Sequence, residues 1–155
     1  MIEHLKSLLF GDDASTGTAL DEVRLAAAAL MVEAAMMDGC MDERERAHIG
    51  LLLRDRFELP GNQAEALLER AVALQEDSIQ LFPLTKTIVD AYSIPQRIEV
   101  IEMLWEVAYA DGQLHDYESN LVRRIAGLLY VPDHESGTAR RRAMAKLGLS
   151  DDPLV

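Results

Sequence analysis

The stretch E-A-A-M-M-D-G-C-M-D-E-R-E at residues 33–45 returns, in altered form, as E-V-A-Y-A-D-G-Q-L-H-D-Y-E at residues 106–118. The first Glu, an Ala, the Asp-Gly pair and the last Glu match at a constant offset (106 − 33 = 73), and no gap is needed. Similarity at a fixed offset indicates that one supersecondary unit is used twice. We therefore expect a duplicated helix–loop–helix unit. We call its two copies the first segment (about 20–59) and the second segment (about 93–132).

The composition favours a compact acidic protein. The chain has 155 residues, of which 49% are hydrophobic and only 5% aromatic, so we expect one domain packed with aliphatic side chains. The net charge of −12 argues against a nucleic-acid ligand, because phosphate binding needs a basic surface. A cation or a basic protein would suit this charge. The sequence leaves the protein partner and the oligomeric state open.

The sequence predicts a cytoplasmic location. The single Cys40 excludes an internal disulfide and fits a reducing compartment. Residues 1–10 carry the acidic Glu3 and have no small-residue cleavage pattern, so they do not resemble a secretory signal. The longest apolar run, at 25–32, is far shorter than the ~20 residues that span a bilayer. We therefore expect no membrane contact.

Apolar residues recur with helical spacing along the whole chain, and no stretch alternates with the period of a strand. Asp42 with Glu45 predicts a capping box at the start of a helix. Gly39 and Gly112 are expected to end helices in the left-handed conformation. The fold class is therefore all-α, with about eight helices. Their expected ranges are about 2–9, 20–38, 42–57, 62–75, 79–91, 93–111, 115–130 and 133–147.

The chain resembles the TerB-like domain family, which includes the tellurite-resistance protein TerB and the N-terminal region of the DjlA co-chaperone. The resemblance rests on E-A-A-x-x-D-G-x-x-D-x-x-E at 33–45, on I-E-M-L-W-E-V-A-Y-A-D-G-Q-L-H-D-Y-E at 101–118 and on L-V-R-R-I-A-G-L-L-Y-V-P at 121–132. It covers about residues 20–135. It implies a bacterial, all-helical, internally duplicated module linked to tellurite or metal stress. The second segment departs from the first in having His115 where the first has Asp42, and no J-domain is present, so the co-chaperone role does not transfer.

The two Asp-Gly corners are the candidate site. Each corner has an aspartate at the end of a helix, where the macrodipole disfavours negative charge. One interpretation is a weak divalent-cation site, for which carboxylate oxygens suit Ca²⁺ or Mg²⁺. The other is that the acids only cap the following helices, in which case the chain is a protein-interaction scaffold without a metal. The candidate ligands are Asp38, Asp42 and Glu45 in the first corner and Asp111, Asp116 and Glu118 in the second.

Other motifs indicate no enzyme. His48 lies three residues after Glu45, but the second segment has Leu121 at the matching position, so a di-iron site is not expected. Cys40 lies among acids, which would raise the pKa of its thiol. No catalytic triad or phosphate-binding glycine loop is present, and we predict no catalytic residue and no firm cofactor. The basic cluster at 140–142 with Lys146 is expected to be a solvated helix face or a docking surface for an acidic partner.

The repeat also predicts two ion pairs. Arg24 precedes Glu33 by nine residues, and Arg97 precedes Glu106 by nine, which is too far for pairing within one helix. If the two long helices cross antiparallel, Arg24 would meet Glu106 and Arg97 would meet Glu33. The alternative is that both arginines face solvent and both glutamates bond elsewhere.

Overall fold

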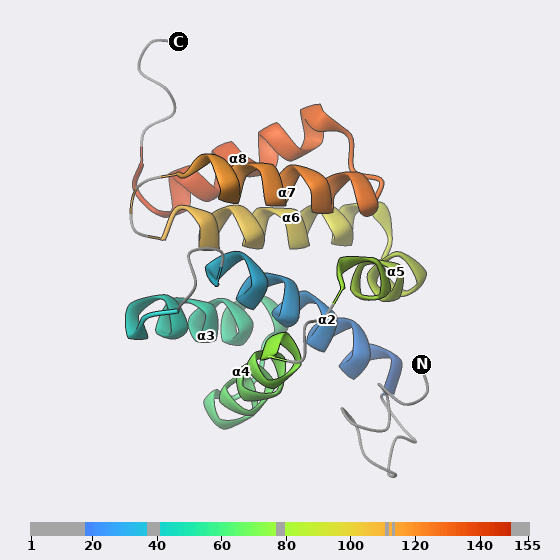
Figure 1. Ribbon diagram of the computed structural model, residues 1–155, viewed down its shortest axis with the longest axis vertical. Coiled ribbons are helices and arrows are strands. Elements are labelled where there is room, and N and C mark those ends of the chain that lie inside the picture. The colour runs from blue at the N-terminus through green and yellow to red at the C-terminus, as the bar shows by residue number, and fades with distance from the viewer. Residues whose placement is uncertain (1–17, 37–40, 77–79, 111, 113, 150–155) are drawn as a thin grey trace.

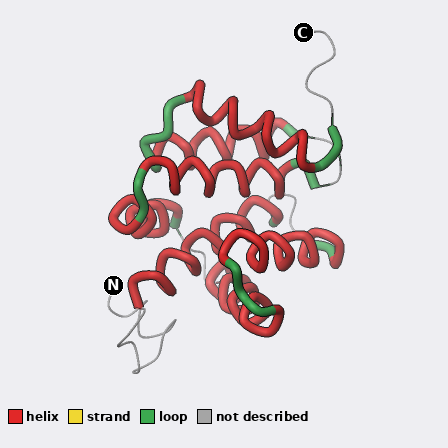
Figure 2. Tube along the Cα trace, turned by 180° about the vertical axis from the view of Figure 1, so that it is seen from behind, coloured by secondary structure: helices red, strands yellow, loops and turns green. Residues whose placement is uncertain are grey.

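The computed structural model describes residues 18–36, 41–76, 80–110, 112 and 114–149, and within these ranges helices are joined by loops and no strand occurs (Figures 1 and 2). The prediction of an all-α fold is confirmed. The expected first helix, at about 2–9, lies outside the described residues. The helices are α2 (Thr18–Ala35), α3 (Glu43–Phe57), α4 (Gly61–Glu76), α5 (Leu81–Ala91), α6 (Ile94–Ala108), α7 (Asp116–Leu128) and α8 (Asp133–Lys146).

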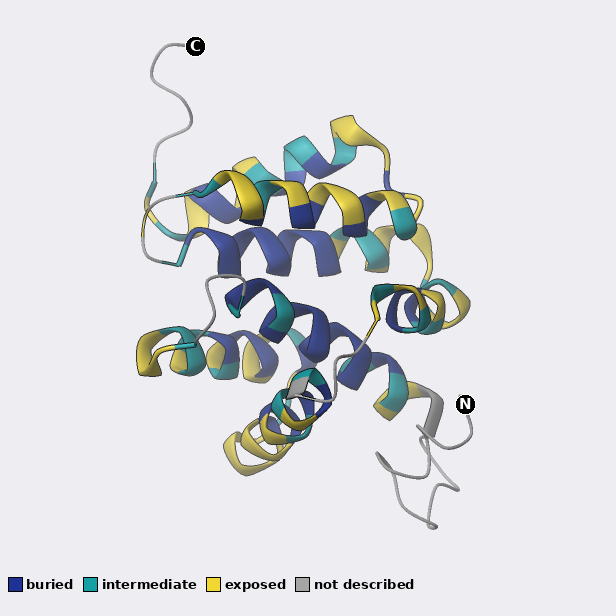
Figure 3. Ribbon diagram, in the orientation of Figure 1, coloured by how far each residue is buried: buried dark blue, intermediate teal, exposed yellow. Residues whose placement is uncertain are grey.

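Helices α2 and α6 form the centre of the molecule, and the other helices surround them (Figure 3). In α2, every residue from Leu25 to Val32 is buried, and all five residues between Arg24 and Leu30 are Leu or Ala, which have high helix propensity. Helices α3, α4 and α5 pack on α2, while α7 and α8 pack on α6. None of the described helices is both long enough and apolar enough to cross a bilayer.

The expected antiparallel crossing of the two long helices is wrong. Helices α2 and α6 contact each other, and Figure 1 shows that both run from the right of the view towards the left. Arg24 donates instead to the Phe57 carbonyl oxygen at 3.3 Å, and Glu106 pairs with Arg56 at 2.6 Å. Arg97 donates to three backbone carbonyls, those of Tyr92 (2.9 Å), Val89 (3.1 Å) and Leu129 (3.4 Å). Both arginines therefore hold helix ends rather than bridge the two segments.

The second helix of each segment ends in the same way. Glu58, after α3, has φ 54° and Tyr130, after α7, has φ 59°, so both occupy the left-handed region without being glycine. The next N–H in each case reaches back five residues to a helix carbonyl: Leu59 to Arg54 (3.1 Å) and Val131 to Ala126 (2.9 Å). This is the Schellman pattern, and a proline follows each motif and prevents the helix from continuing.

Several predicted helix ends need correction. Asn62 and Asp133 have side chains typical of N-caps, and the sequence predicts that they cap the helices expected at about 62–75 and 133–147. Instead, α4 already begins at Gly61, and Asp133 is the first residue of α8, whose N-cap is Pro132. Gly112 has φ 86°, as predicted, yet α6 ends at Ala108, so this glycine lies within the corner rather than directly after the helix. Its N–H donates to the Tyr109 carbonyl at 2.8 Å. Gly39 lies outside the described residues.

Candidate functional site

The described part of the first corner, which begins at residue 41, forms a helix cap. Asp42 is the N-cap of α3, and its Oδ1 accepts a hydrogen bond from the Glu45 N–H at 2.7 Å. Glu45 returns the interaction, because its Oε1 accepts from the Asp42 N–H at 3.0 Å. This reciprocal pair satisfies two of the N–H groups that a helix start leaves without a partner. The predicted capping box is confirmed. Asp38 lies outside the described residues.

The second corner has the same backbone pattern with different chemistry. The Glu118 Oε1 accepts from the His115 N–H at 3.4 Å, and Glu118 is buried. Asp116 is the exposed first residue of α7. The His115 ring stacks on that of Tyr117, with centroids 5.4 Å apart and planes inclined by 7°. An imidazole therefore stands where the first corner has a carboxylate. Asp111 lies outside the described residues.

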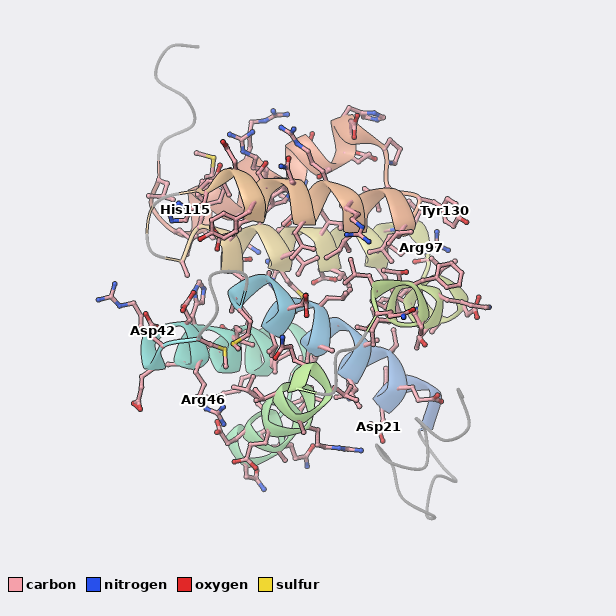
Figure 4. All side chains as sticks on the ribbon, in the orientation of Figure 1. Asp21, Asp42, Arg46, Arg97, His115 and Tyr130 are labelled. Atoms are coloured by element: carbon pink, nitrogen blue, oxygen red, sulfur yellow. The ribbon has the colours of Figure 1, made fainter. Side chains whose placement is uncertain are left out.

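The two corners lie on the same side of the molecule. In Figure 4, the labelled Asp42 and His115 both lie at the left, where α3 and α7 begin. Among the described residues, no group of three or more His, Cys, Asp or Glu side chains has the proximity needed to hold a metal ion. Asp42, Glu45, Asp116 and Glu118 therefore do not make a complete ligand set by themselves.

A network of ion pairs lies away from the two corners, between α3, α6 and α8. We call them the ion cluster: Arg56 on α3; Glu99, Glu102 and Glu106 on α6; Arg142 and Lys146 on α8. Arg56 Nη2 lies 2.5 Å from Glu102 and 2.6 Å from Glu106, and its Nη1 lies 3.2 Å from Glu99. Glu102 also accepts from Arg142 Nε at 2.6 Å and from Lys146 Nζ at 2.5 Å. Three cations and three carboxylates face one another, so the cluster is neutral as a whole.

The ion cluster controls the ionisation of its members. Burial raises the pKa of Glu102, but hydrogen bonds from Lys146, Arg142 and Arg56 outweigh burial and bring this pKa down to about 2. The side chains of Glu102 and Glu106 are each only 6% exposed. Burial lowers the pKa of the Arg56 guanidinium, but the hydrogen bonds and charges of Glu102 and its neighbours prevail, and the net shift is upward. These charges hold three helices together in their ionised forms.

His48 on α3 adds a titratable group beside the cluster. Burial lowers the pKa of its imidazole, and the negative charge of Glu106 opposes this shift. The side chain is half-buried. At neutral pH the imidazole is therefore uncharged.

The basic cluster at 140–142 with Lys146 also has a structural role. Arg142 and Lys146 are each 48% exposed and bond to Glu102 in the ion cluster. Arg140 Nε donates to the Tyr109 hydroxyl at 2.8 Å, and its guanidinium lies 5.9 Å from the centre of the Trp105 ring. Trp105 itself is buried and donates to Ser136 Oγ at 3.2 Å. The spacing of Glu102 and Glu106, four residues apart on an apolar helix, was the sequence signal for buried charges in need of cations.

The comparisons with known proteins agree with this architecture. The family model described as "Tellurite resistance protein TerB" matches residues 24–141, which is more than half of the chain. The chain belongs to the TerB family. The match includes α3, α6 and α7 completely, with both corners and all the members of the ion cluster up to Glu106. It ends at Arg141, one residue before the first α8 member of the cluster. No curated protein and no solved structure matches the chain.

Proposed function

We propose that the chain is a cytoplasmic, non-enzymatic helical module that acts in the response to tellurite or metal stress. The observation that carries this proposal is the use of the buried charges. Glu102, whose pKa is the most strongly perturbed, is bonded to three cations from two other helices. A carboxylate held this way stabilises the fold and has no lone pair directed at a substrate. Family membership supplies the link to tellurite.

Growth in tellurite tests this link. Deletion of the gene from its source cell should lower tellurite tolerance, and expression of the wild-type chain should restore it. Asp55→Asn is the control for this complementation, because it alters an exposed acid on α3 and should leave the fold intact. Its expression should restore tolerance as the wild type does. Unchanged tolerance after deletion would contradict the assignment.

The candidate activity of the module is weak divalent-cation binding at the two corners. Both corners lie on one side of the molecule, and Asp42 and Asp116 are exposed there. Their oxygens, with those of Glu45, Glu118, Asp38 and Asp111, would suit Ca²⁺ or Mg²⁺. Each corner contributes few carboxylates, so we expect modest affinity. High-affinity Zn²⁺ binding through Cys40 and His48 would contradict an oxygen-based site.

The alternative is a protein-interaction scaffold in which the corner acids are caps. The reciprocal hydrogen bonds between Asp42 and Glu45 favour it, because each side chain already serves the backbone. Calorimetric titration of Ca²⁺, Mg²⁺, Mn²⁺ and Zn²⁺ into chelator-treated protein separates the two possibilities. Asn is as good an N-cap as Asp, so Asp42→Asn combined with Asp116→Asn preserves the helices and removes two candidate ligands.

The cation hypothesis predicts heat of binding and a higher melting temperature with the cation, both reduced in the double variant. Asp55→Asn is the matched control, because it removes one exposed acid from the same helix away from the corner, and it should bind like the wild type. The scaffold hypothesis predicts no heat and no change in melting temperature with any of the four ions.

A further inference from the structure

A groove lies between α3 and α4. It has a volume of about 490 Å³, and small residues from both helices line it: Ala47 and Gly50 from α3, Gly61 and Ala64 from α4. Leu51 lines it as well, and half of its surface (51%) is exposed to solvent. Figure 4 shows Arg46 pointing into the space between α3 and α4. Small side chains here would let another helix approach closely.

The charges on α3 follow the same face. Glu43, Ala47, Gly50 and Arg54 are spaced i, i+4, i+7 and i+11, so they lie in one line along the helix. All four line the groove. A negative charge stands at one end of this line and a positive charge at the other, with the two small residues between them. Within the described residues, neither the Glu43 nor the Arg54 side chain makes an ion pair. Arg46, by contrast, pairs with Glu65 on α4 at 2.8 Å.

We propose that this groove is the interface through which two copies of the chain associate. The pattern on α3 is complementary to itself when reversed: the midpoint between residues 43 and 54 is also the midpoint between residues 47 and 50. When two α3 helices pack antiparallel about a two-fold axis at this midpoint, Glu43 of each copy lies level with Arg54 of the other. Ala47 of each copy then lies level with Gly50 of the other, at the point of closest approach. A two-fold interface requires such self-complementarity.

The charge of the groove favours a second copy over other occupants. The protein as a whole carries −12, so two copies repel each other over most of their surfaces. The charged residues that line the groove are two glutamates and two arginines, and they sum to zero. Two copies can therefore meet here without bringing like charges together. The two new ion pairs would stand roughly 16 Å apart along the helix, one on each side of the crossing. Leu51 of each copy adds apolar surface to the contact.

Sedimentation equilibrium over a wide range of protein concentration, combined with charge reversal, tests the proposal. Glu43→Arg and Arg54→Glu each place two pairs of like charges in the homodimer, so each should weaken association at least tenfold. An equimolar mixture of the two variants restores both ion pairs in the heterodimer and should associate like the wild type. Arg123→Glu, on the exposed face of α7, is the matched control for the change in net charge and should leave association unaltered apart from a general salt-dependent effect.

A second variant separates the interface from the fold. A Cβ added at Gly50 would meet nothing within 4 Å, and Gly50 lines the open groove, so we expect the monomer to accommodate Gly50→Leu and to keep or raise its melting temperature. In the dimer the larger side chain blocks the closest approach, so this variant should be monomeric. The proposal is overturned if the wild type remains monomeric up to millimolar concentration. Association that survives Gly50→Leu and both charge reversals would equally overturn it, because the contact would then lie elsewhere.

Discussion

Arg24 and Arg97, which are 73 residues apart, both donate from the guanidinium to a carbonyl at the end of the second helix of their own segment. Arg24 Nη2 reaches Phe57 at 3.3 Å, and Arg97 Nη1 reaches Leu129 at 3.4 Å. The carbonyls at a helix C-terminus have no partner within the helix and carry partial negative charge. A cation placed there satisfies both needs. The two arginines are therefore held without any carboxylate among the described residues.

We predict that Arg97→Met destabilises the protein more than Arg24→Met. Arg97 has three carbonyl acceptors, while Arg24 has one, and the Arg24 Nε is buried with no acceptor among the described residues. Hydrogen bonds to a charged group contribute about 1.5–3 kcal/mol, so Arg97→Met should cost over ~2 kcal/mol. Arg24→Met should cost under ~1 kcal/mol, because it also removes a buried donor without an acceptor, and this gain offsets most of the one lost bond. Urea unfolding at pH 7 measures both. Equal losses in the free energy of unfolding would show that the number of carbonyl acceptors does not determine how much each arginine stabilises the protein.

We predict that Glu102→Gln costs about 2 kcal/mol at pH 7. The drop in the pKa of Glu102 from 4.5 to about 2 corresponds to ~3 kcal/mol at most, and we reduce this because Arg142 and Lys146 are each 48% exposed. The folded protein binds fewer protons than the unfolded chain between these two values. Wild-type stability should therefore fall as the pH is lowered from 4.5 towards 2.

In the Gln variant this acid-sensitive contribution is absent, so the difference from wild type should narrow over the same pH range. Glu99→Gln is the matched control, because Glu99 is on the same helix but is 51% exposed and, among the residues that the structure describes, bonds to Arg56 alone. It should cost under ~0.5 kcal/mol. A constant difference between wild type and Glu102→Gln from pH 7 to pH 2.5 would contradict the assignment.

We predict that His48 titrates below its usual value of 6.5 and that Glu106→Gln lowers its pKa further. Burial already disfavours the imidazolium, and the variant removes the negative charge that partly offsets this. Chemical shifts of the imidazole protons, followed by NMR against pH, report both values. The folded protein then binds fewer protons than the unfolded chain below pH 6.5, so His48 makes stability fall as the pH drops through that range. An unchanged or raised pKa of His48 in Glu106→Gln would contradict this charge interaction.

We predict opposite effects for alanine at two glycines. Gly112 has φ 86°, where an L-residue is strained, so Gly112→Ala should destabilise the protein by about 1 kcal/mol. Gly127 is helical in α7, and Gly127→Ala should stabilise the protein by up to ~1 kcal/mol. A Cβ at either position meets nothing within 4 Å, so neither effect involves a clash. Thermal melts of the two variants should move in opposite directions.

The sequence was most informative where local chemistry decides the structure. The Asp42–Glu45 capping box and the left-handed conformation of Gly112 were both readable from neighbouring residues. These features depend on hydrogen bonds that span three to five residues. The helical periodicity and the apolar run in α2 were equally local, and they were sufficient for the all-α assignment.

What the sequence did not predict was the pairing of charges distant along the chain. Arg56 and Glu106 are 50 residues apart, and Lys146 and Glu102 are 44 apart. The repeat suggested a partner for Glu106 by assuming an antiparallel crossing, whereas α2 and α6 run the same way. The direction of packing depends on how the whole set of apolar faces is buried together. No short motif encodes that arrangement.

The ion cluster has a consequence for how the chain can be divided. Arg56 comes from the first segment, Glu102 and Glu106 from the second, and Lys146 from the helix that follows both. A fragment that ends after α7 would leave Glu102 with one of its three cations, and a fragment that begins at α5 would lose Arg56. The first piece keeps one cation for two buried carboxylates, and in the second piece Glu106 exchanges its 2.6 Å contact with Arg56 for the 3.8 Å contact with Lys146. We therefore expect the described helices to unfold in one cooperative transition. A tandem array built from copies of one segment alone would likewise lack the partners that the other segment and α8 supply to the ion cluster.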